Sequence, residues 1–260
     1  MPSNLEAQII ATKSFLAELR VRPGRRTIDH GLARYLWLGI QTSEVINLAC
    51  QADHPAGTAS LRRYLLETVL DIYMLVSSDS PQLDVAKSMV WDVIDWDRTW
   101  DHHKKAVAAD PSLDTERVQV HTREDAFEVL RSELEGLGED LSWLDQAIEA
   151  AEASRHWHWS GKGPSGRMKE LAERAKDDQE HQGVVAMLNA IWKTLSSSSH
   201  PSPAWQKLKI EERDETLHFP STSTGGSQPS QQVVTHTIHM LESCQNLIAQ
   251  YREMDELEGG

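Results

Sequence analysis

The sequence predicts an all-α protein, and three observations support that fold class. Apolar residues recur about every 3.6 residues through most of the 260-residue chain, as they do in helices that bury one face. Alternating runs of β-branched residues, which would indicate strands, are missing. Helix breakers such as Pro23-Gly24 and Gly136-Leu137-Gly138 separate the periodic segments. We therefore predict one helical domain that spans residues 1–260.

Four helices are expected in the first part of the chain. Ser3 and Glu6 have the spacing of a capping box at the start of the first helix, and Pro23-Gly24 follows its end. A segment with proline and glycine at 53–57 ends the second helix. Ser80-Pro81 combines a cap with a first-turn proline at the start of the fourth. The expected ranges are about 4–20, 28–51, 58–77 and 80–107.

Further helices are expected from Thr122 onward, with Thr122 and Asp140 as candidate N-caps. The segment 220–231 is rich in Ser, Thr, Gly and Pro, and we predict a flexible loop over about 209–231. Because one helix cannot bury its own apolar face, the final helix is expected to pack against the others in the same domain. The expected ranges are about 122–135, 139–154, 165–176, 178–196 and 231–256.

Charge and hydropathy restrict the classes of function. The formal net charge of −14 disfavours broad affinity for the phosphate backbone of nucleic acids, although a local basic patch can still bind. The arginine-rich segment 20–26 is such a patch, and it is either an anion contact or a solvated loop between helices. No apolar run is long enough to span a membrane, and the first residues lack the pattern of a secretory signal.

Cys50 and Cys244 are the only cysteines, and both fall in apolar helical patterns. Two buried thiols in a reducing cytosol are expected, since these two cysteines cannot build a zinc or redox motif. We therefore expect a cytoplasmic protein without a membrane segment, a cofactor or a metal ion. Candidate partners are RNA, a protein and a second copy of the chain, and the sequence does not choose among them.

The helix expected at 58–77 carries the first candidate site residues. It is apolar on two faces, which is typical of a central helix. Arg63, Glu67 and Asp71 are spaced by four residues and therefore share one helix face. This stripe is either a solvated face or part of a polar cleft. In a cleft, Arg63 would bind an anion, and Glu67 would orient a partner or act as a base.

The helix expected at 178–196 ends in a second polar pair. Ser196 and His200 also lie four residues apart, which would bring a histidine base within reach of a serine. The spacing is common, and the alternative is a histidine that satisfies carbonyl groups at the helix C-terminus. If the two helices pack together, the four polar residues form one catalytic cluster rimmed by two tryptophans. The predicted site residues are Arg63, Glu67, Ser196 and His200, with Trp159 and Trp192 as substrate-binding residues.

These segments together resemble a bacterial helical family of unknown function that is placed near the HEPN-type helical domains. The resemblance rests on Arg63 to Glu67, Trp159, Lys169-Glu170-Leu171-Ala172, and the segment Trp192 to Pro201, where tryptophan replaces the tyrosine expected at 192. It covers about residues 30–205. It implies a mostly antiparallel helical bundle. HEPN-type domains include metal-independent ribonucleases of toxin and antiviral systems, and also non-catalytic members.

The ribonuclease members carry an arginine that is followed, after four to six residues, by a histidine. Such pairs arise often by chance in a chain with twelve histidines. His103 falls on the apolar stripe of its helix, which favours a core histidine. The resemblance therefore leaves open whether the chain is an enzyme. The pairs with this spacing are Arg25 and His30, Arg98 and His103, Arg174 and His181, and Arg213 and His218.

Two functions remain open. The first is a HEPN-like protein of stress or phage-defence type that cleaves RNA without metal, with His200 exchanging the proton and Arg63 stabilising the charged phosphorane. The second is a non-catalytic ligand-binding or protein-interaction bundle in which the same cluster is a structural network.

Two other histidine-containing segments have alternative explanations. His236 and His239 share a helix face, but the chain has no pair of Glu-x-x-His motifs, so they are expected at the edge of the final helix. The run His156-Trp157-His158-Trp159 either stacks on bases or plugs the end of the bundle.

Overall fold

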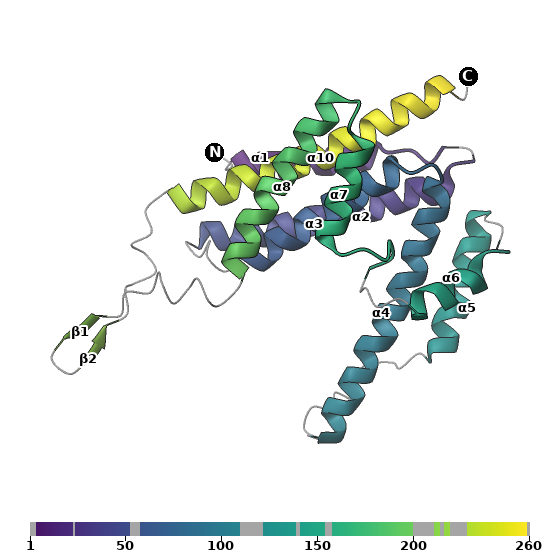
Figure 1. The fold of residues 1–260 in the computed structure, drawn as a ribbon, viewed down its shortest axis with the longest axis horizontal. Coiled ribbons are helices and arrows are strands. Elements are labelled where there is room, and N and C mark those ends of the chain that lie inside the picture. Colours follow the sequence, from purple (N-terminus) through teal and green to yellow (C-terminus); the bar gives the residue numbers. More distant parts are fainter. Residues whose placement is uncertain are drawn as a thin grey trace. The chain divides into compact units, whose positions relative to one another are not determined.

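The structure is a computed structural model that describes residues 4–22, 24–52, 58–109, 122–138, 141–153, 158–199, 211–213, 216–218 and 228–258. Helices make up nearly all of these residues (Figure 1), which confirms the all-α fold class. The elements are α1 (Asn4–Glu18), α2 (Arg26–Gln51), α3 (Ala59–Val76), α4 (Pro81–Ala109), α5 (Arg123–Leu137), α6 (Leu144–Ala153), α7 (Pro164–Arg174), α8 (Gln179–Ser199), β1 (Glu211–Arg213), β2 (Thr216–His218) and α10 (Gln228–Glu258).

Several helix ends follow the local pattern of the sequence. The Thr122 hydroxyl accepts a hydrogen bond from the backbone N–H of Asp125, whose carboxylate accepts one from the Thr122 N–H, so α5 begins with a capping box. Gly138 ends α5 with a φ of 85°, a left-handed conformation that favours glycine. α4 begins at Pro81, as expected. The expected caps Ser3 and Asp140 lie outside the described residues.

Four elements differ from the expectation. α6 begins at Leu144 rather than near 139. Within the predicted flexible loop 209–231, β1 and β2 form a hairpin with Glu211 opposite His218, and α10 begins at Gln228. Strands of three residues are too short to leave a period-two pattern, so the sequence did not indicate them. The other residues of 209–227 lie outside the described part of the chain.

The chain groups into two compact units, which we describe one at a time. Unit 1 consists of Met1–Arg20, Leu32–Ser77 and Met168–Gly260. Unit 2 consists of Val21–Gly31 and Ser78–Arg167. The single domain expected from the sequence stays a prediction.

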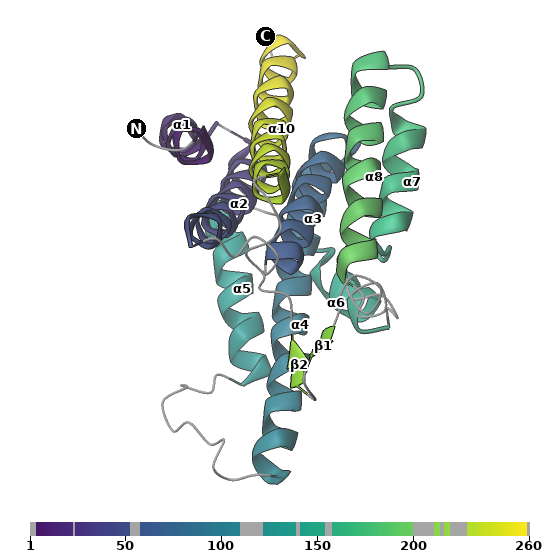
Figure 2. The same ribbon diagram turned by 90° about the vertical axis from the view of Figure 1, so that its left-hand side faces the viewer.

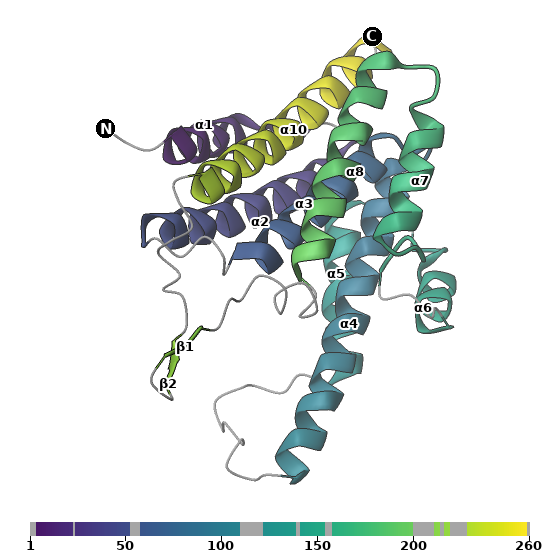
Figure 3. The same ribbon diagram turned by 60° about the vertical axis from the view of Figure 1, so that its left-hand side comes forward.

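Unit 1 is built around α3, which packs against both α8 and α10, while α1 lies along α10 (Figures 2 and 3). Every residue of α3 from Leu65 to Leu75 is buried except Glu67. The central position expected for this helix is thus found within unit 1. Two hydrogen bonds tie the first segment of the unit to its last: Gln8 to Gln245 at 2.7 Å and Arg252 to the Arg20 carbonyl at 2.8 Å.

The contacts of α3 also give the directions of its neighbours. Arg63 contacts Trp192, and Tyr73 contacts His181 ten residues further along α3, so α3 and α8 run in opposite directions. Arg62 interacts with His236, whereas Tyr73 shares a cavity with Leu247, so α3 and α10 run in the same direction. The mostly antiparallel bundle implied for about residues 30–205 stays a prediction, since α10 lies outside that range and a long connection lets the chain return in either direction.

Unit 2 is held by the contacts of α4 with α5 and α6. Its apolar core joins Val90 and Ile94 of α4 to Leu130 and Leu134 of α5 and to Leu144 of α6. At the start of α2, Gly31 lies against Val85 of α4. None of the helices in the described ranges combines the length and the apolar character required to cross a lipid bilayer.

Candidate functional site

Arg63, Glu67 and Trp192 meet between α3 and α8 in unit 1, and we call them the Arg63 cluster. Nε of Arg63 donates to Oε1 of Glu67 at 3.2 Å. The Arg63 guanidinium carbon lies 4.7 Å from the centre of the Trp192 ring, within the range of a cation–π contact. The side chains of Arg63 and Glu67 are 37% and 31% exposed, so solvent still reaches them. The structure therefore brings together three of the residues predicted for the site.

The structure does not test the predicted roles of the other three site residues. Ser196 lies in α8 one helical turn after Trp192, but its side chain is outside the described part of the chain. His200 follows the last residue of α8 and is itself outside it. Trp159 belongs to unit 2, and its predicted place at the rim of the cluster stays a prediction. The cluster of four polar side chains thus stays a prediction.

The polar stripe of α3 changes character along the helix. Arg63 and Glu67 are about one-third exposed, whereas Asp71 is only 8% exposed. A uniformly solvated face, one of the two sequence interpretations, is therefore wrong at Asp71. The reason is that α3 enters the core of unit 1 after its second turn, so the third member of the stripe is covered by neighbouring helices.

Arg62 forms a second basic group beside the Arg63 cluster, and the sequence analysis missed it. Nε of Arg62 and Nδ1 of His236 have no solvent-accessible surface and no hydrogen-bond partner within the described ranges. Burial lowers the pKa of Arg62. Burial, followed by the positive charges of Arg62 and His239, lowers the pKa of His236. Paired arginines at 62–63 and paired histidines at 236 and 239 were visible in the sequence, but only the packing of α3 on α10 joins them.

The two thiols differ in burial. Cys244 is fully buried in α10, and burial raises its pKa to about 12, as expected for a core thiol. Cys50 lies in the last turn of α2 and is only partly buried, so the expectation of two buried thiols is wrong for it.

Unit 2 holds a cavity of about 290 Å³ beside Trp159. The segment 158–161 forms a tight turn, in which the Gly161 N–H donates to the His158 carbonyl at 2.9 Å and Gly161 has a φ of 65°. Nδ1 of His158 lies 2.7 Å from the Ser160 hydroxyl and accepts from the Ser160 N–H at 3.1 Å. These bonds fix the turn that carries Trp159, which lines the cavity together with Trp91 and Lys87 from α4.

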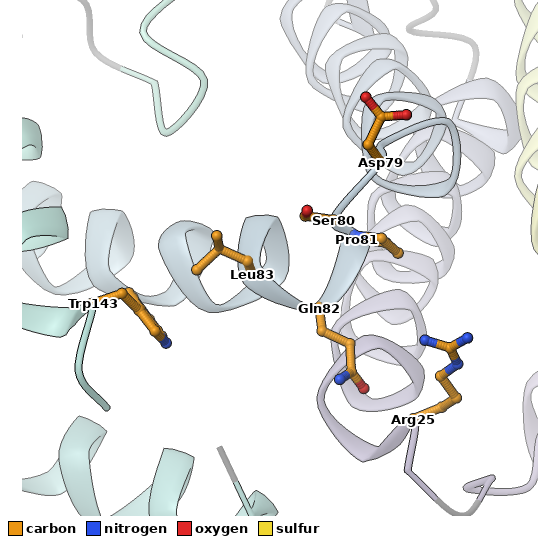
Figure 4. A pocket seen from close by; sticks show the side chains of 7 residues that line it. All are labelled: Arg25, Asp79, Ser80, Pro81, Gln82, Leu83 and Trp143. Carbon is orange, nitrogen blue, oxygen red and sulfur yellow. The ribbon is translucent and has the colours of Figure 1, made fainter. Parts of the chain in front are cut away.

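A more open cavity of about 370 Å³ in unit 2 involves the arginine-rich segment 20–26 (Figure 4). Arg25 and Gln82 line one side of it, and Trp143 lies across from them. Arg22 does not contribute, because Asp29 holds its side chain at 2.7 Å and also accepts from its backbone N–H. Part of this segment therefore serves the local structure. Asp79 is also among the residues that line the cavity, so the lining carries both charges.

In the one fully described arginine–histidine pair with the ribonuclease spacing, Arg174 and His181 contact different partners. Arg174 donates to the carbonyl groups of Met74 and Ser77 and to Glu170, so it closes the C-terminal end of α3. His181 lies 2.9 Å from the Asp178 carboxylate, and both Arg174 and His181 line a small cavity of about 110 Å³ in unit 1.

The other three pairs are only partly described. Arg98 lies over the Trp91 ring at 5.1 Å, and the His103 side chain is outside the described part. His30 is exposed, and the side chains of Arg213 and His218 are also outside the described part. None of these four pairs is therefore shown to form a catalytic site.

Neither a search for metal-binding groups nor comparison with known proteins assigns a function to these residues. Within the described ranges, no group of three or more His, Cys, Asp or Glu side chains is arranged to hold a metal ion. Comparisons with protein-family models, curated proteins and solved structures found no match. No relative supplies a function, so the side chains of this chain must indicate one.

Proposed function

We propose that the chain is a HEPN-like helical protein of stress or phage-defence type that binds RNA at the Arg63 cluster and cleaves it without a metal ion. The observation that carries the proposal is the contact between Arg63 and Trp192. This contact joins two segments that are far apart in the sequence and on which the resemblance to the HEPN-type domains rests. Its all-helical fold is consistent with that resemblance.

The Arg63 cluster has the chemistry of an RNA-binding surface. Glu67 and Trp192 hold the guanidinium in place, so Arg63 loses little side-chain freedom when it binds a phosphate. Bases of single-stranded RNA stack on aromatic rings and on guanidinium planes. Lys193, the exposed neighbour of Trp192, adds a second positive charge. A small basic and aromatic surface of this kind is compatible with an acidic protein, because phosphate binding depends on local charge.

Cleavage would use the end of α8. The ribose 2′-oxygen attacks the adjacent phosphorus and gives its proton to His200. Arg63 stabilises the negative charge of the phosphorane that forms. The 5′-oxygen then leaves and takes the proton that His200 accepted, which gives a 2′,3′-cyclic phosphate and a 5′-hydroxyl end. Ser196, one turn before His200 in the sequence, donates to a phosphate oxygen, and Glu67 keeps Arg63 oriented.

One observation favours a second candidate, a non-catalytic ligand-binding or protein-interaction bundle. Glu67 and Trp192 already occupy Arg63 without a ligand. In this alternative the Arg63 cluster is a structural network that fixes α8 on α3.

An RNA degradation assay separates these candidates. The purified chain is incubated with end-labelled single-stranded RNA, with and without EDTA. We expect cleavage that the chelator does not change and that is lost in His200→Ala and in Arg63→Ala. Arg131→Ala is the matched control, because Arg131 is an exposed arginine whose pair with Asp145 lies in unit 2. This control variant should cleave like the unmodified chain.

Thermal melting of the same variants shows whether the Arg63 cluster has a structural role instead. If the unmodified chain never cleaves RNA and both variants melt several degrees lower, the cluster is structural and the ribonuclease proposal is wrong. If the variants melt normally and the unmodified chain binds RNA by fluorescence anisotropy without cleaving it, the non-catalytic binding role is supported instead.

A further inference from the structure

The start of α3 and the first half of α10 bring together two side chains that the proposed ribonuclease function does not use, Arg62 and His236. Both belong to unit 1, and both are partly buried. Nε of Arg62 and Nδ1 of His236 have no accessible surface, and neither atom has a hydrogen-bond partner in the described part of the chain. The two groups interact electrostatically. We call them the Arg62–His236 pair.

Positive charge predominates around this pair. α3 contributes the guanidinium of Arg62, and α2 contributes Cys50, whose thiol stays neutral because burial raises its pKa. α10 itself contributes His239, which is half exposed and lies 3.7 Å from the Glu242 carboxylate. α1 also packs against α10, but none of its charged side chains is among the described groups that shift the pKa of His236. A charge gained by His236 would therefore lie beside Arg62, and no carboxylate is among the described groups that act on it.

Protonation of His236 turns the pair from a donor and an acceptor into two donors. In a neutral imidazole with its hydrogen on Nε2, Nδ1 is an acceptor, which is complementary to the N–H group of Arg62 Nε. In the imidazolium both ring nitrogens are donors. Neither buried N–H group then has an acceptor within the described ranges, and two positive charges lie side by side. Both effects favour an open state in which water solvates the two groups.

The first half of α10 is held less firmly than the second. Among the described side chains of residues 231–240, no hydrogen bond reaches another element, and the Thr237 hydroxyl donates within the helix at 2.8 Å. Further along, Gln245 and Arg252 bind the first segment of unit 1. Local opening of the first half can therefore stop where these anchors begin. The buried side chains are Val233, Thr237 and Met240 in the first half, and Leu241, Cys244, Leu247, Ile248 and Tyr251 in the second.

We propose that the Arg62–His236 pair is a pH-sensitive switch: below about pH 6, His236 takes up a proton and residues 228–240 of α10 separate from α3, while residues 241–258 stay docked. Opening uncovers the guanidinium of Arg62 next to the Arg63 cluster, and it uncovers the Cys50 thiol. Since an unhindered histidine titrates near about 6.5, the opening equilibrium can rise about tenfold between about pH 7.5 and about pH 5.5. The proposal concerns unit 1 alone and does not depend on RNA cleavage.

Hydrogen exchange of the full chain, followed by mass spectrometry at both pH values, tests the proposal. Exchange rates are divided by those of the unfolded chain at the same pH, which gives a protection factor for each segment. We expect the protection of amides 232–240 to fall about tenfold from about pH 7.5 to about pH 5.5. Amides 245–258 should keep their protection, because their helical acceptors lie at residue 241 and beyond.

Three variants assign the opening to the pair. His236→Gln carries no charge at either pH, so it should keep its protection in acid. Arg62→Gln removes the fixed positive charge, so it should lose less protection than the unmodified chain. His239→Gln is the matched control, because His239 is a half-exposed histidine of the same helix, and it should open like the unmodified chain. Thermal melting at about pH 7.5 shows which variants are folded, and the two halves of α10 in the unmodified chain can be compared without any variant.

Three results would overturn the proposal. One is equal protection of amides 232–240 at the two pH values. Another is an equal loss in amides 232–240 and 245–258, which would mean that acid unfolds unit 1 as a whole. The last is an unchanged loss in folded His236→Gln, which would assign the opening to other groups. Failure of RNA cleavage at the Arg63 cluster would leave these measurements unaffected.

Discussion

Gly31 in the second turn of α2 lies directly against Val85 of α4, so that a β-carbon on residue 31 would overlap the valine side chain. The close approach of the two helices in unit 2 therefore depends on the missing side chain. Gly31→Ala should destabilise the protein by about 1–3 kcal/mol, the typical cost of overpacking. Urea unfolding measures this change.

Two further variants make the Gly31 prediction specific. Gly31→Ala combined with Val85→Ala should recover part of the loss, because the overlapping methyl groups are removed. Gly183→Ala is the control, since Gly183 is an exposed residue of α8 with open space around it. There alanine should raise stability by about 0.5–1 kcal/mol through helix propensity. Equal effects at positions 31 and 183 would contradict the explanation.

Stability should fall in mildly acidic solution because of His236. Its pKa is lowered by burial and by the positive charges of Arg62 and His239. As the pH falls below about 6.5, the unfolded chain takes up a proton that the folded chain resists, which favours unfolding. His236→Gln should therefore lose less stability than the unmodified chain between about pH 7.5 and about pH 5.5.

Urea unfolding at both pH values measures the His236 effect. His30→Gln is the control, because His30 is an exposed histidine of α2. If His236→Gln and His30→Gln respond alike to acid, the partly buried position of His236 does not set the acid sensitivity.

Stability should also fall in alkaline solution because of Tyr73. Burial, and then the negative charge of Asp178, raise the pKa of Tyr73 to about 12, whereas an unfolded tyrosine titrates near about 10. Between these values the unfolded chain releases the phenol proton and the folded chain keeps it, so stability decreases as the pH rises. Tyr73→Phe should lose less stability than the unmodified chain between about pH 8 and about pH 11.

Tyr64→Phe is the matched control for Tyr73, because Tyr64 lies on the same helix and is 50% exposed. Urea unfolding of the two variants at both pH values gives the comparison. An unchanged alkaline loss in Tyr73→Phe would show that other groups cause it.

Local interactions explain which parts of the fold could be predicted from the sequence. The N-cap at Thr122, the Pro81 start and the break at Gly136-Leu137-Gly138 each depend on neighbouring residues, and the structure confirms the cap and the start and ends α5 at Leu137, within that break. The β1–β2 hairpin and the common direction of α3 and α10 depend on pairing between segments, for which helical periodicity carries no information.

The same distinction holds for the candidate sites. Arg63 and Glu67 could be paired from their spacing, because four residues bring side chains together on one helix. Their contact with Trp192 depended on the assumption that the helices expected at 58–77 and 178–196 pack together. The unsatisfied groups of Arg62 and His236, and the cavity lined by Trp91 and Trp159, follow from tertiary packing, and no local pattern indicates them.

The hydrogen bond between Gln8 and Gln245 spans 237 positions of the chain, and it has a consequence for synthesis on the ribosome. At about 5–20 residues per second, α1 emerges about 10–50 s before the helix against which it packs. During that interval the apolar face of α1 lacks α10, whereas all segments of unit 2 are available once Arg167 has been added. Unit 2 should therefore fold first in the cell, and the nascent N-terminal helices are natural clients for a chaperone.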